Sequence, residues 1–310
     1  MWLLRMVKTM HKYFKIFLFL LFLWFLSYLS AFFFFEDGAV SGNEIVVIPI
    51  EGMITLEGEG SLFSSSTSGE ALVERIEDAH ANPSVKGIVL EINSPGGTVM
   101  GSKVVADALK KVEKPTVAVI TEYGTSGAYW IASQADYIVA DELSIVGSIG
   151  VLGSYFEFGG LLEYYNVTYQ RLVTGKYKDI SSPYREMSEE EEELVMERLQ
   201  SIHDYFVSDV AAGRSMEVAD VEKLATGLFY LGQDSVENGL IDFIGNKDYA
   251  IELTREMAGI TDGDVSEYGE KESFFTKFLR EYTAYSSFYI GQGIGTVLFS
   301  VETSDLHIQV

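Results

Sequence analysis

The chain has 310 residues, no cysteine and a net charge of −24, from 46 acidic and 22 basic residues. The absence of cysteine excludes a disulfide framework and any thiolate nucleophile or thiolate metal site. The acidic excess argues against nucleic acid as a partner, because phosphate backbones are recognised largely through Lys and Arg. The four histidines are scattered without metal-ligand spacing, so we expect no metal and no other cofactor.

An almost unbroken apolar segment, residues 16–35, follows a basic tail of residues 1–15. A helix of that length, at ~1.5 Å per residue, spans the ~30 Å hydrocarbon core of a bilayer. The positive-inside rule predicts a cytoplasmic N-terminus and a domain outside the cytoplasm. A cleaved signal peptide is the alternative, but such peptides end in small residues, whereas Phe32–Phe35 end this segment. We therefore expect an uncleaved, single-pass anchor in the cell membrane.

The remaining chain alternates strand and helix. Short β-branched or apolar runs predict strands over Glu44–Ile50, Gly87–Ile92, Thr116–Ile120, Tyr137–Ala140, Ile145–Leu152 and Thr168–Val173, and again after Leu228. Helical spacing predicts helices over 70–81, 99–111 and 161–165, with a polar loop over 51–69. A long helix follows Ser188, where Glu191 completes a capping box. This alternation predicts an α/β fold with a largely parallel sheet and right-handed crossovers.

A single serine, Ser126, lies between the strand at 116–120 and an apolar helical pattern that begins at Gly127. A strand, a tight turn of small residues and a helix can lift a serine hydroxyl to the head of the helix. The neighbouring backbone N–H then points at the atom that the hydroxyl attacks. An ordinary helix N-cap is the alternative interpretation of a Ser-Gly pair alone.

A second turn, Pro95-Gly96-Gly97, ends a predicted strand and opens a helix about thirty residues earlier. Glycines there allow a sharp turn that leaves N–H groups pointing outward. A carbonyl oxygen that becomes an oxyanion needs two such donors at ~2.7–3.1 Å. The N–H groups of Gly97 and Gly127 are candidates for that pair.

A nucleophilic serine also needs a base. No histidine lies in a motif, so the candidates are two lysines, Lys176 and Lys178, on the loop after residue 173. A lysine that acts as a base near neutral pH must have its pKa lowered from ~10.4 to about 7, which burial can achieve. Both lysines could instead be ordinary surface residues.

These motifs together resemble signal peptide peptidase A, in its short single-repeat form. The matching runs are Asn93–Gly97, Ser126-Gly127, Gly147–Val151, Tyr177–Ile180, Tyr230–Gln233 and Gly239–Asp242. The resemblance covers roughly residues 44–259. It implies a ClpP/crotonase-type fold with repeated β-β-α units and a membrane-anchored serine–lysine protease. Its substrates would be remnant signal peptides and other hydrophobic segments.

The resemblance also implies the roles of individual residues. Ser126 would be the nucleophile, Lys178 the general base, and Gly97 and Gly127 the oxyanion donors. Ser148 would orient the lysine amine, and Lys176 lies outside the match. The family forms ring-shaped homo-oligomers, so Lys178 of one subunit would complete the serine of the next. Ala128 stands where the family often has a second glycine.

Residues 260–310 lie outside the resemblance. Their aromatic residues at helical spacing, followed by a short apolar run, predict either an oligomer contact or a membrane-surface helix. Three other functions remain open at this point. They are a related membrane serine–lysine protease that trims partner membrane proteins such as stomatins, an acyl-CoA hydratase of the same fold, and an inactive membrane scaffold. The membrane anchor and the serine–lysine pair argue against the hydratase.

Overall fold

The computed structural model describes residues 14–27, 42–58 and 66–269. Within them, eight strands form a mostly parallel sheet, in the order β10-β1-β4-β5-β6-β9, with β7 beside β5 and β8 beside β7. The strands are β1 (Glu44–Glu51), β4 (Val85–Ser94), β5 (Thr116–Thr125), β6 (Tyr137–Ala140), β7 (Ile145–Gly147), β8 (Phe229–Leu231), β9 (Phe243–Ile244) and β10 (Asp264–Glu267). The β7–β8 pair is antiparallel. The predicted α/β class with a largely parallel sheet is confirmed.

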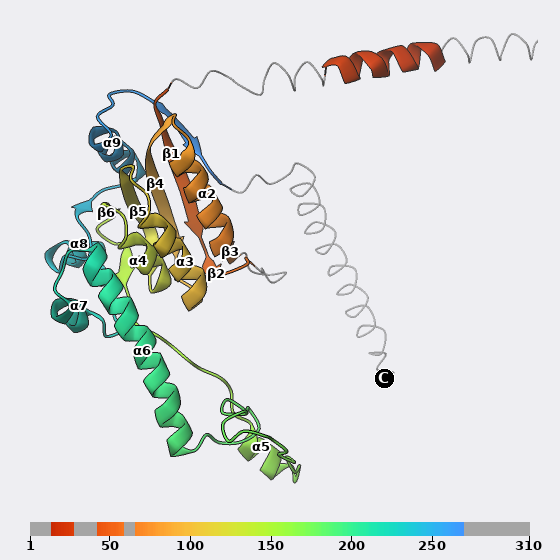
Figure 1. Ribbon diagram of the computed structural model, residues 1–310, viewed down its shortest axis with the longest axis vertical. Coiled ribbons are helices and arrows are strands. Elements are labelled where there is room, and N and C mark those ends of the chain that lie inside the picture. Colours follow the sequence, from red (N-terminus) through yellow and green to blue (C-terminus); the bar gives the residue numbers. More distant parts are fainter. Residues whose placement is uncertain (1–13, 28–41, 59–65, 270–310) are drawn as a thin grey trace, which may run out of the picture. The chain divides into compact units, whose positions relative to one another are not determined.

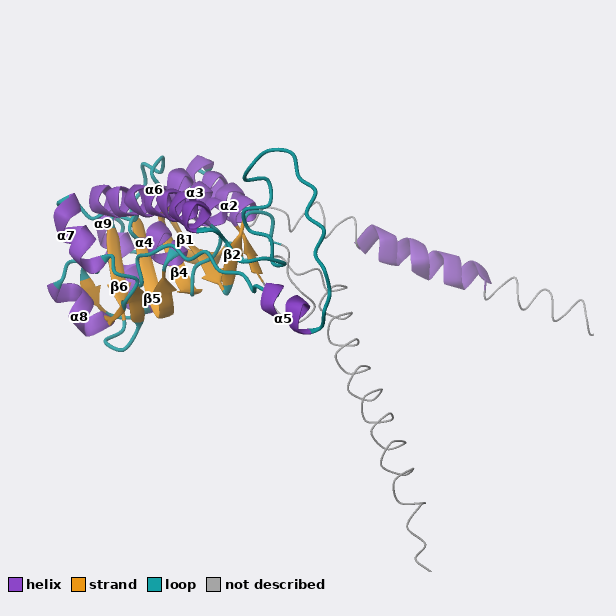
Figure 2. Ribbon diagram, turned by 90° about the horizontal axis from the view of Figure 1, so that it is seen from below, coloured by secondary structure: helices purple, strands orange, loops and turns teal. Residues whose placement is uncertain are grey.

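Helices cover both faces of the sheet (Figure 1). On one face pack α2 (Gly69–Ala81), α3 (Val99–Leu109), α4 (Gly127–Ala132) and the C-terminal half of α6 (Glu189–Gly213), and on the other packs α9 (Lys247–Met257). Figure 2 shows α2, α3 and α6 in a row along one side of the strands. Alternate residues of β1 face opposite sides, since Ile48 joins the α2–α3 core and Val47 joins the α9 core. The strands are therefore buried on both faces, as their β-branched runs predict.

The helix α6 begins at the expected signal. Ser188 is its N-cap, and Ser188 and Glu191 form the predicted capping box. Two short helices follow, α7 (Val218–Leu224) and α8 (Gly232–Glu237). Before α6, residues 153–187 form a projecting segment that contains α5 (Gly159–Tyr164) and lies at the N-terminal end of α6, away from the strands (Figure 1). The C-terminal half of α6 therefore packs on the sheet, while its N-terminal end lies beside the projecting segment.

Some local predictions are wrong. Residues 168–173 form no strand and pair with no described strand, because they belong to the projecting segment beyond the edge of the sheet. The strand expected over 145–152 ends at Gly147, where the backbone takes a φ of 86°. The loop expected over 51–69 contains two short paired strands, β2 (Met53–Thr55) and β3 (Ser66–Ser68). The pairing of β10 with β1 continues the sheet past residue 259, where the sequence indicated the end of the domain.

The predicted membrane anchor lies only partly within the described residues. Residues 14–27 are helical, while 28–35 lie outside the described ranges. Among the helices that the structure describes, none is long and apolar enough to cross a membrane. The chain divides into two compact units, residues 1–268 and 269–310. The predicted helix of the tail lies in the second unit, beyond the last described residue.

Candidate active site

Ser126 connects β5 to α4 in an unusual backbone conformation. Its φ of 53° and ψ of −124° are rare for a residue with a side chain. Its N–H donates to the carbonyl oxygen of Gly147 at 2.7 Å, and its carbonyl accepts from the N–H of Trp130 at 2.9 Å. The side chain makes no capping bond to the helix that it precedes. The backbone of Ser126 is thus held on both sides, which leaves its hydroxyl available for chemistry rather than for capping.

The glycine turn after β4 lies directly against this serine. A Cβ added at Gly96, which has a φ of 95°, would lie 2.7 Å from the nitrogen of Gly127 and 3.0 Å from the Cβ of Ser126. A Cβ added at Gly97 would lie 1.8 Å from the carbonyl oxygen of Ile54. No side chain fits at either position. The glycines therefore permit the close approach of two loops that are separated by about thirty residues in the sequence.

Two backbone N–H groups meet at this contact. Gly97 is bridged to Ile54 through its neighbours, since Ile54 donates to Gly96 at 2.9 Å and Thr98 donates to Ile54 at 2.8 Å. These bonds leave the N–H of Gly97 itself without a role in the bridge. Gly127 is the first residue of α4, where an N–H has no acceptor within the helix. The nitrogen of Gly97 lies 3.3 Å from the position that a Cβ of Gly127 would take, so the two groups are neighbours beside Ser126.

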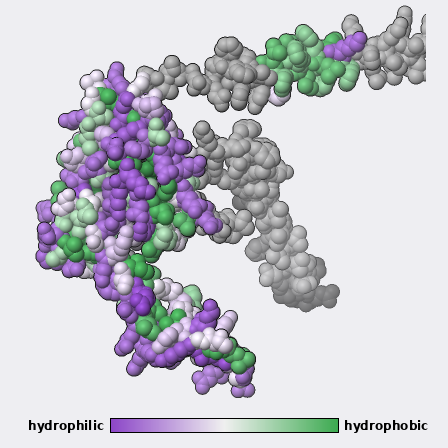
Figure 3. Space-filling view, in the orientation of Figure 1, coloured by the Kyte–Doolittle hydropathy of each residue, from purple (hydrophilic) through white to green (hydrophobic). Residues whose placement is uncertain are grey.

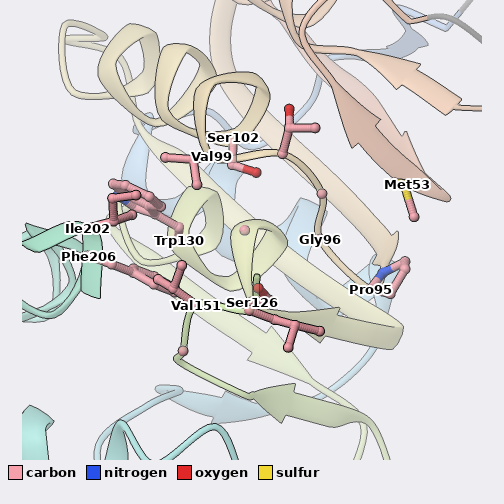
Figure 4. A pocket seen from close by; sticks show the side chains of 15 residues that line it. Met53, Pro95, Gly96, Val99, Ser102, Ser126, Trp130, Val151, Ile202 and Phe206 are labelled. Carbon is pink, nitrogen blue, oxygen red and sulfur yellow. The ribbon is translucent and has the colours of Figure 1, made fainter. Parts of the chain in front are cut away.

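A cavity of about 460 Å³ opens beside the serine (Figure 4). It is mostly apolar and is lined by Met53, Pro95–Val99, Ser102, Ser126, Gly127, Trp130, Gly150–Leu152, Ile202 and Phe206. Trp130 stacks on Phe206 with ring centroids 4.6 Å apart. Its indole N–H donates to the carboxylate of Asp209 in α6 at 2.7 Å, which fixes the Trp130 ring between α4 and α6. The cavity can take an apolar side chain beside the nucleophile.

Ser148 lies in a second cavity next to Ser126. The two serines line this cavity, of about 480 Å³, together with His203 and the loop at 225–227. Ser148 has a φ of 48°, and its hydroxyl donates to the carbonyl oxygen of Gly227 at 3.0 Å. A hydroxyl that donates its proton in this way still has lone pairs for an incoming amine. Ser148 can therefore accept a hydrogen bond from a lysine placed in this cavity.

Several residues of the site carry no recognisable sequence signal. His203 is a lone histidine within a long helix, and its Nε2 lies 3.0 Å from the carbonyl oxygen of Ala225. Ile202 and Phe206 form part of the first cavity from the same helix. Helical periodicity identifies such positions as buried but not as parts of a site, because α6 is sixty residues or more beyond Ser126.

Lys178 is exposed and lines neither cavity that contains Ser126. It lies in a turn of the projecting segment, where its backbone N–H donates to Gly175 at 3.1 Å. Within the described ranges its amino group makes no ion pair and no hydrogen bond. One chain therefore brings Gly97, Ser126, Gly127 and Ser148 together and leaves Lys178 apart from them.

The amino group of Lys176, in contrast, is bound within the chain. It pairs with the carboxylate of Glu190 at 2.5 Å, and both side chains are exposed. This hydrogen bond raises the pKa of Lys176. A raised pKa keeps the amine protonated, and a protonated amine cannot accept the proton of a serine. Of the two candidate bases, Lys176 is therefore the one whose amine is held in an ion pair within the single chain.

A serine lifted from the end of a parallel strand, with two N–H donors beside it and an apolar cavity next to it, defines the class of serine peptidases. Comparison with known proteins agrees. Residues 108–261 match the model of peptidase family S49. A protein named as a protease in Methanocaldococcus jannaschii is 34% identical over 79% of both chains. A protein named as signal peptide peptidase SppA in Enterococcus faecium is 37% identical over 75% of this chain and 69% of that one.

The chain belongs to peptidase family S49 and is a serine protease. Protease 4 of Haemophilus influenzae is 30% identical over 69% of this chain, which corresponds to 35% of that longer protein. The resemblance found in the sequence motifs is thus confirmed at the level of the family. The acyl-CoA hydratase alternative is wrong, because these relatives carry the names of proteases.

Proposed function

We propose that this protein is a membrane-anchored signal peptide peptidase that cleaves remnant signal peptides and hydrophobic membrane-derived segments with a Ser126–Lys178 dyad. The observation that carries the proposal is the packing of the Gly96-Gly97 turn against Ser126 and Gly127 beside an apolar cavity that all of them line. The name of the Enterococcus faecium relative agrees with this substrate class.

The chemistry follows from the positions of these groups. The hydroxyl oxygen of Ser126 attacks the scissile carbonyl carbon while the neutral amine of Lys178 takes its proton. The carbonyl oxygen becomes an oxyanion that accepts from the N–H groups of Gly97 and Gly127. The lysine then returns the proton to the departing amine, which leaves an acyl-serine. Water activated by the same lysine hydrolyses the ester, and Ser148 holds the lysine amine in position.

The apolar cavity explains the choice of substrate. Trp130, Ile202 and Phe206 offer walls that an apolar side chain can fill. Burial of such a side chain contributes about 1.5–3 kcal/mol of binding. Hydrophobic segments therefore bind better than polar peptides of the same length.

We place the base on a neighbouring subunit. In a single chain Lys178 is exposed and lines neither cavity with Ser126. The projecting segment and its root also expose large apolar side chains, including Leu152 at 87%, Phe156 at 82% and Leu172 at 96% (Figure 3). A second copy of this chain would cover them, and a head-to-tail contact of this kind can close into a ring. Burial of the lysine in that contact favours its neutral form, as a general base requires.

The anchor would keep this ring at its substrates. The side chains of the described helix 14–27 are all exposed, and nearly all are apolar. As the start of the segment 16–35, this helix suits the hydrocarbon core of a membrane. By the positive-inside rule the protease domain then lies outside the cytoplasm, where signal peptides are left after export.

Three variants test the dyad. Ser126→Ala and Lys178→Ala should each abolish hydrolysis of an apolar peptide, while Lys176→Ala keeps most of it. Activity should rise from mildly acidic to alkaline pH with a midpoint well below ~10.4, the value of a free lysine. Wild-type turnover by Lys178→Ala, or a profile still rising at pH 10, would contradict the proposed base.

Mixing tests the sharing between subunits. Ser126→Ala and Lys178→Ala proteins, each inactive, are combined under conditions in which subunits exchange. Some neighbouring pairs then contain one intact serine and one intact lysine, so activity returns if the dyad forms between chains. Mixed oligomers that remain inactive would place both residues in one chain.

A further inference from the structure

The turn that carries Lys178 is held by charged neighbours. The residue after it, Asp179, accepts two hydrogen bonds from the guanidinium of Arg171, at 2.6 and 2.7 Å. Arg185 donates to the same carboxylate at 3.2 and 3.3 Å and to the backbone carbonyl of Asp179 at 3.1 Å. Both the side chain and the backbone next to Lys178 are therefore bound by Arg185.

The same arginine is bound to α6. Its guanidinium donates to both carboxylate oxygens of Glu191, at 2.7 and 2.8 Å, and a bidentate pair of this kind fixes direction as well as distance. Glu191 is only 7% exposed and also accepts from the backbone N–H of Ser188 at 3.0 Å. Arg185 thus joins the Lys178 turn to the first turn of α6.

The bridge stays charged over the range in which the protease would act. Hydrogen bonds from Arg185 lower the pKa of Glu191 to about 2. Hydrogen bonds from Arg171 and then Arg185 hold the pKa of Asp179 well below its usual range. Neither carboxylate takes up a proton between pH 5 and 9, so the bridge does not change while the lysine titrates.

A second link between the turn and α6 serves as a comparison. Lys176 pairs with Glu190, but both partners are more than half exposed. Exposed ion pairs of this kind are screened and contribute little. The more buried bridge through Arg185 is therefore the one that fixes the turn.

We propose that Arg185 is a positioning residue for catalysis, since its bridge from Asp179 to Glu191 sets where α6 presents Lys178 to the neighbouring subunit. This inference rests on the proposed role of Lys178 as the base. Helix α6 has 25 residues and is therefore ~37 Å long. Its far end packs on Trp130 through Phe206. Without the bridge the turn can shift relative to α6 and displace the amine, and ~1 Å of misplacement can cost ~100-fold in rate.

The experiment compares neighbouring acids on the same helix. Glu191→Gln removes the charge that binds Arg185 but keeps a residue that can complete a capping box. Glu190→Gln, its matched control, removes the exposed ion pair to Lys176 and keeps a side-chain oxygen that can still accept from the hydroxyl of Tyr177. Arg185→Gln breaks the bridge from the other side, and Arg185→Lys restores a charge without the bidentate geometry.

We expect Glu191→Gln and Arg185→Gln to lower kcat at least ~10-fold while KM changes less than ~2-fold, because the base is displaced and the substrate cavity is intact. Their pH profiles should shift towards alkaline values, since a loosely placed lysine is better hydrated. Arg185→Lys should recover part of the rate, and Glu190→Gln should stay within about 2-fold of the wild type.

Thermal unfolding and sedimentation measure folding and assembly of each variant. If Arg185→Gln fails to assemble, Glu191→Gln decides the question. Wild-type kcat and an unshifted pH profile in both bridge variants would overturn the positioning role, as would an equal loss in Glu190→Gln. Full activity of Lys178→Ala would instead overturn the proposed base, so the two failures are distinguishable.

Discussion

Replacement of Gly97 by alanine tests whether its N–H stabilises the oxyanion. The new Cβ would lie 1.8 Å from the carbonyl oxygen of Ile54, whereas real contacts are not shorter than 3.0 Å. The turn or β2 must therefore move by about 1.2 Å, the difference of these two distances. A donor moved that far from an ideal ~2.9 Å no longer bonds to the oxyanion. The loss of one such donor costs about 100- to 1,000-fold in kcat.

The assay is hydrolysis of an apolar peptide, with kcat and KM measured separately. KM should change little, because the apolar cavity remains. The added Cβ would also strain the two backbone hydrogen bonds at Ile54, so the free energy of unfolding of the variant should fall by about 1–3 kcal/mol. Gly42→Ala is the matched control, since a Cβ there meets no described atom within 4 Å. A Gly97→Ala protein that keeps half of the wild-type kcat would refute the oxyanion role.

Three further outcomes are expected. Phe206→Ala should lower the free energy of unfolding by about 3–5 kcal/mol in urea titration, because it removes a buried ring stacked on Trp130; a loss below ~1 kcal/mol would contradict this packing. The pKa of Glu191 is lowered by its hydrogen bonds to Arg185, so the stability from that pair is complete above pH ~4.3 and is lost as the pH falls to about 2. Pepsin digestion across that window should show the projecting segment loosening, and Glu191→Gln should loosen it at every pH. Protease added to spheroplasts should digest the domain; full protection would reverse the predicted topology.

The strands and the glycine turns were predictable from the sequence because their signals are local. Strand β6 is observed over the predicted residues, and β1, β4 and β5 contain theirs. The proximity of Gly97 to Gly127 agrees with their expected pairing as oxyanion donors, and the glycines of each turn are a local signal. The capping box at Ser188 is a signal of four residues and was found directly.

The rest depends on contacts that no short pattern encodes. The run 168–173 has strand propensity but pairs with no described strand, because it lies in the projecting segment. The cavity walls at Ile202 and Phe206 come from a helix whose approach to Ser126 is fixed only by packing. Arg185 lies six residues from both Asp179 and Glu191, and that spacing has no meaning until the turn folds back on α6.

The backbone of Ser126 carries a consequence for how this protein evolves. A φ of 53° at a residue with a side chain costs about 1–3 kcal/mol, a penalty that glycine avoids at the expense of ~0.5–1 kcal/mol of chain entropy. Ser126→Gly would therefore be at least as stable as the active enzyme while lacking its nucleophile. Selection for stability alone would remove the serine, so an inactive descendant that still needed this fold would be expected to carry glycine there.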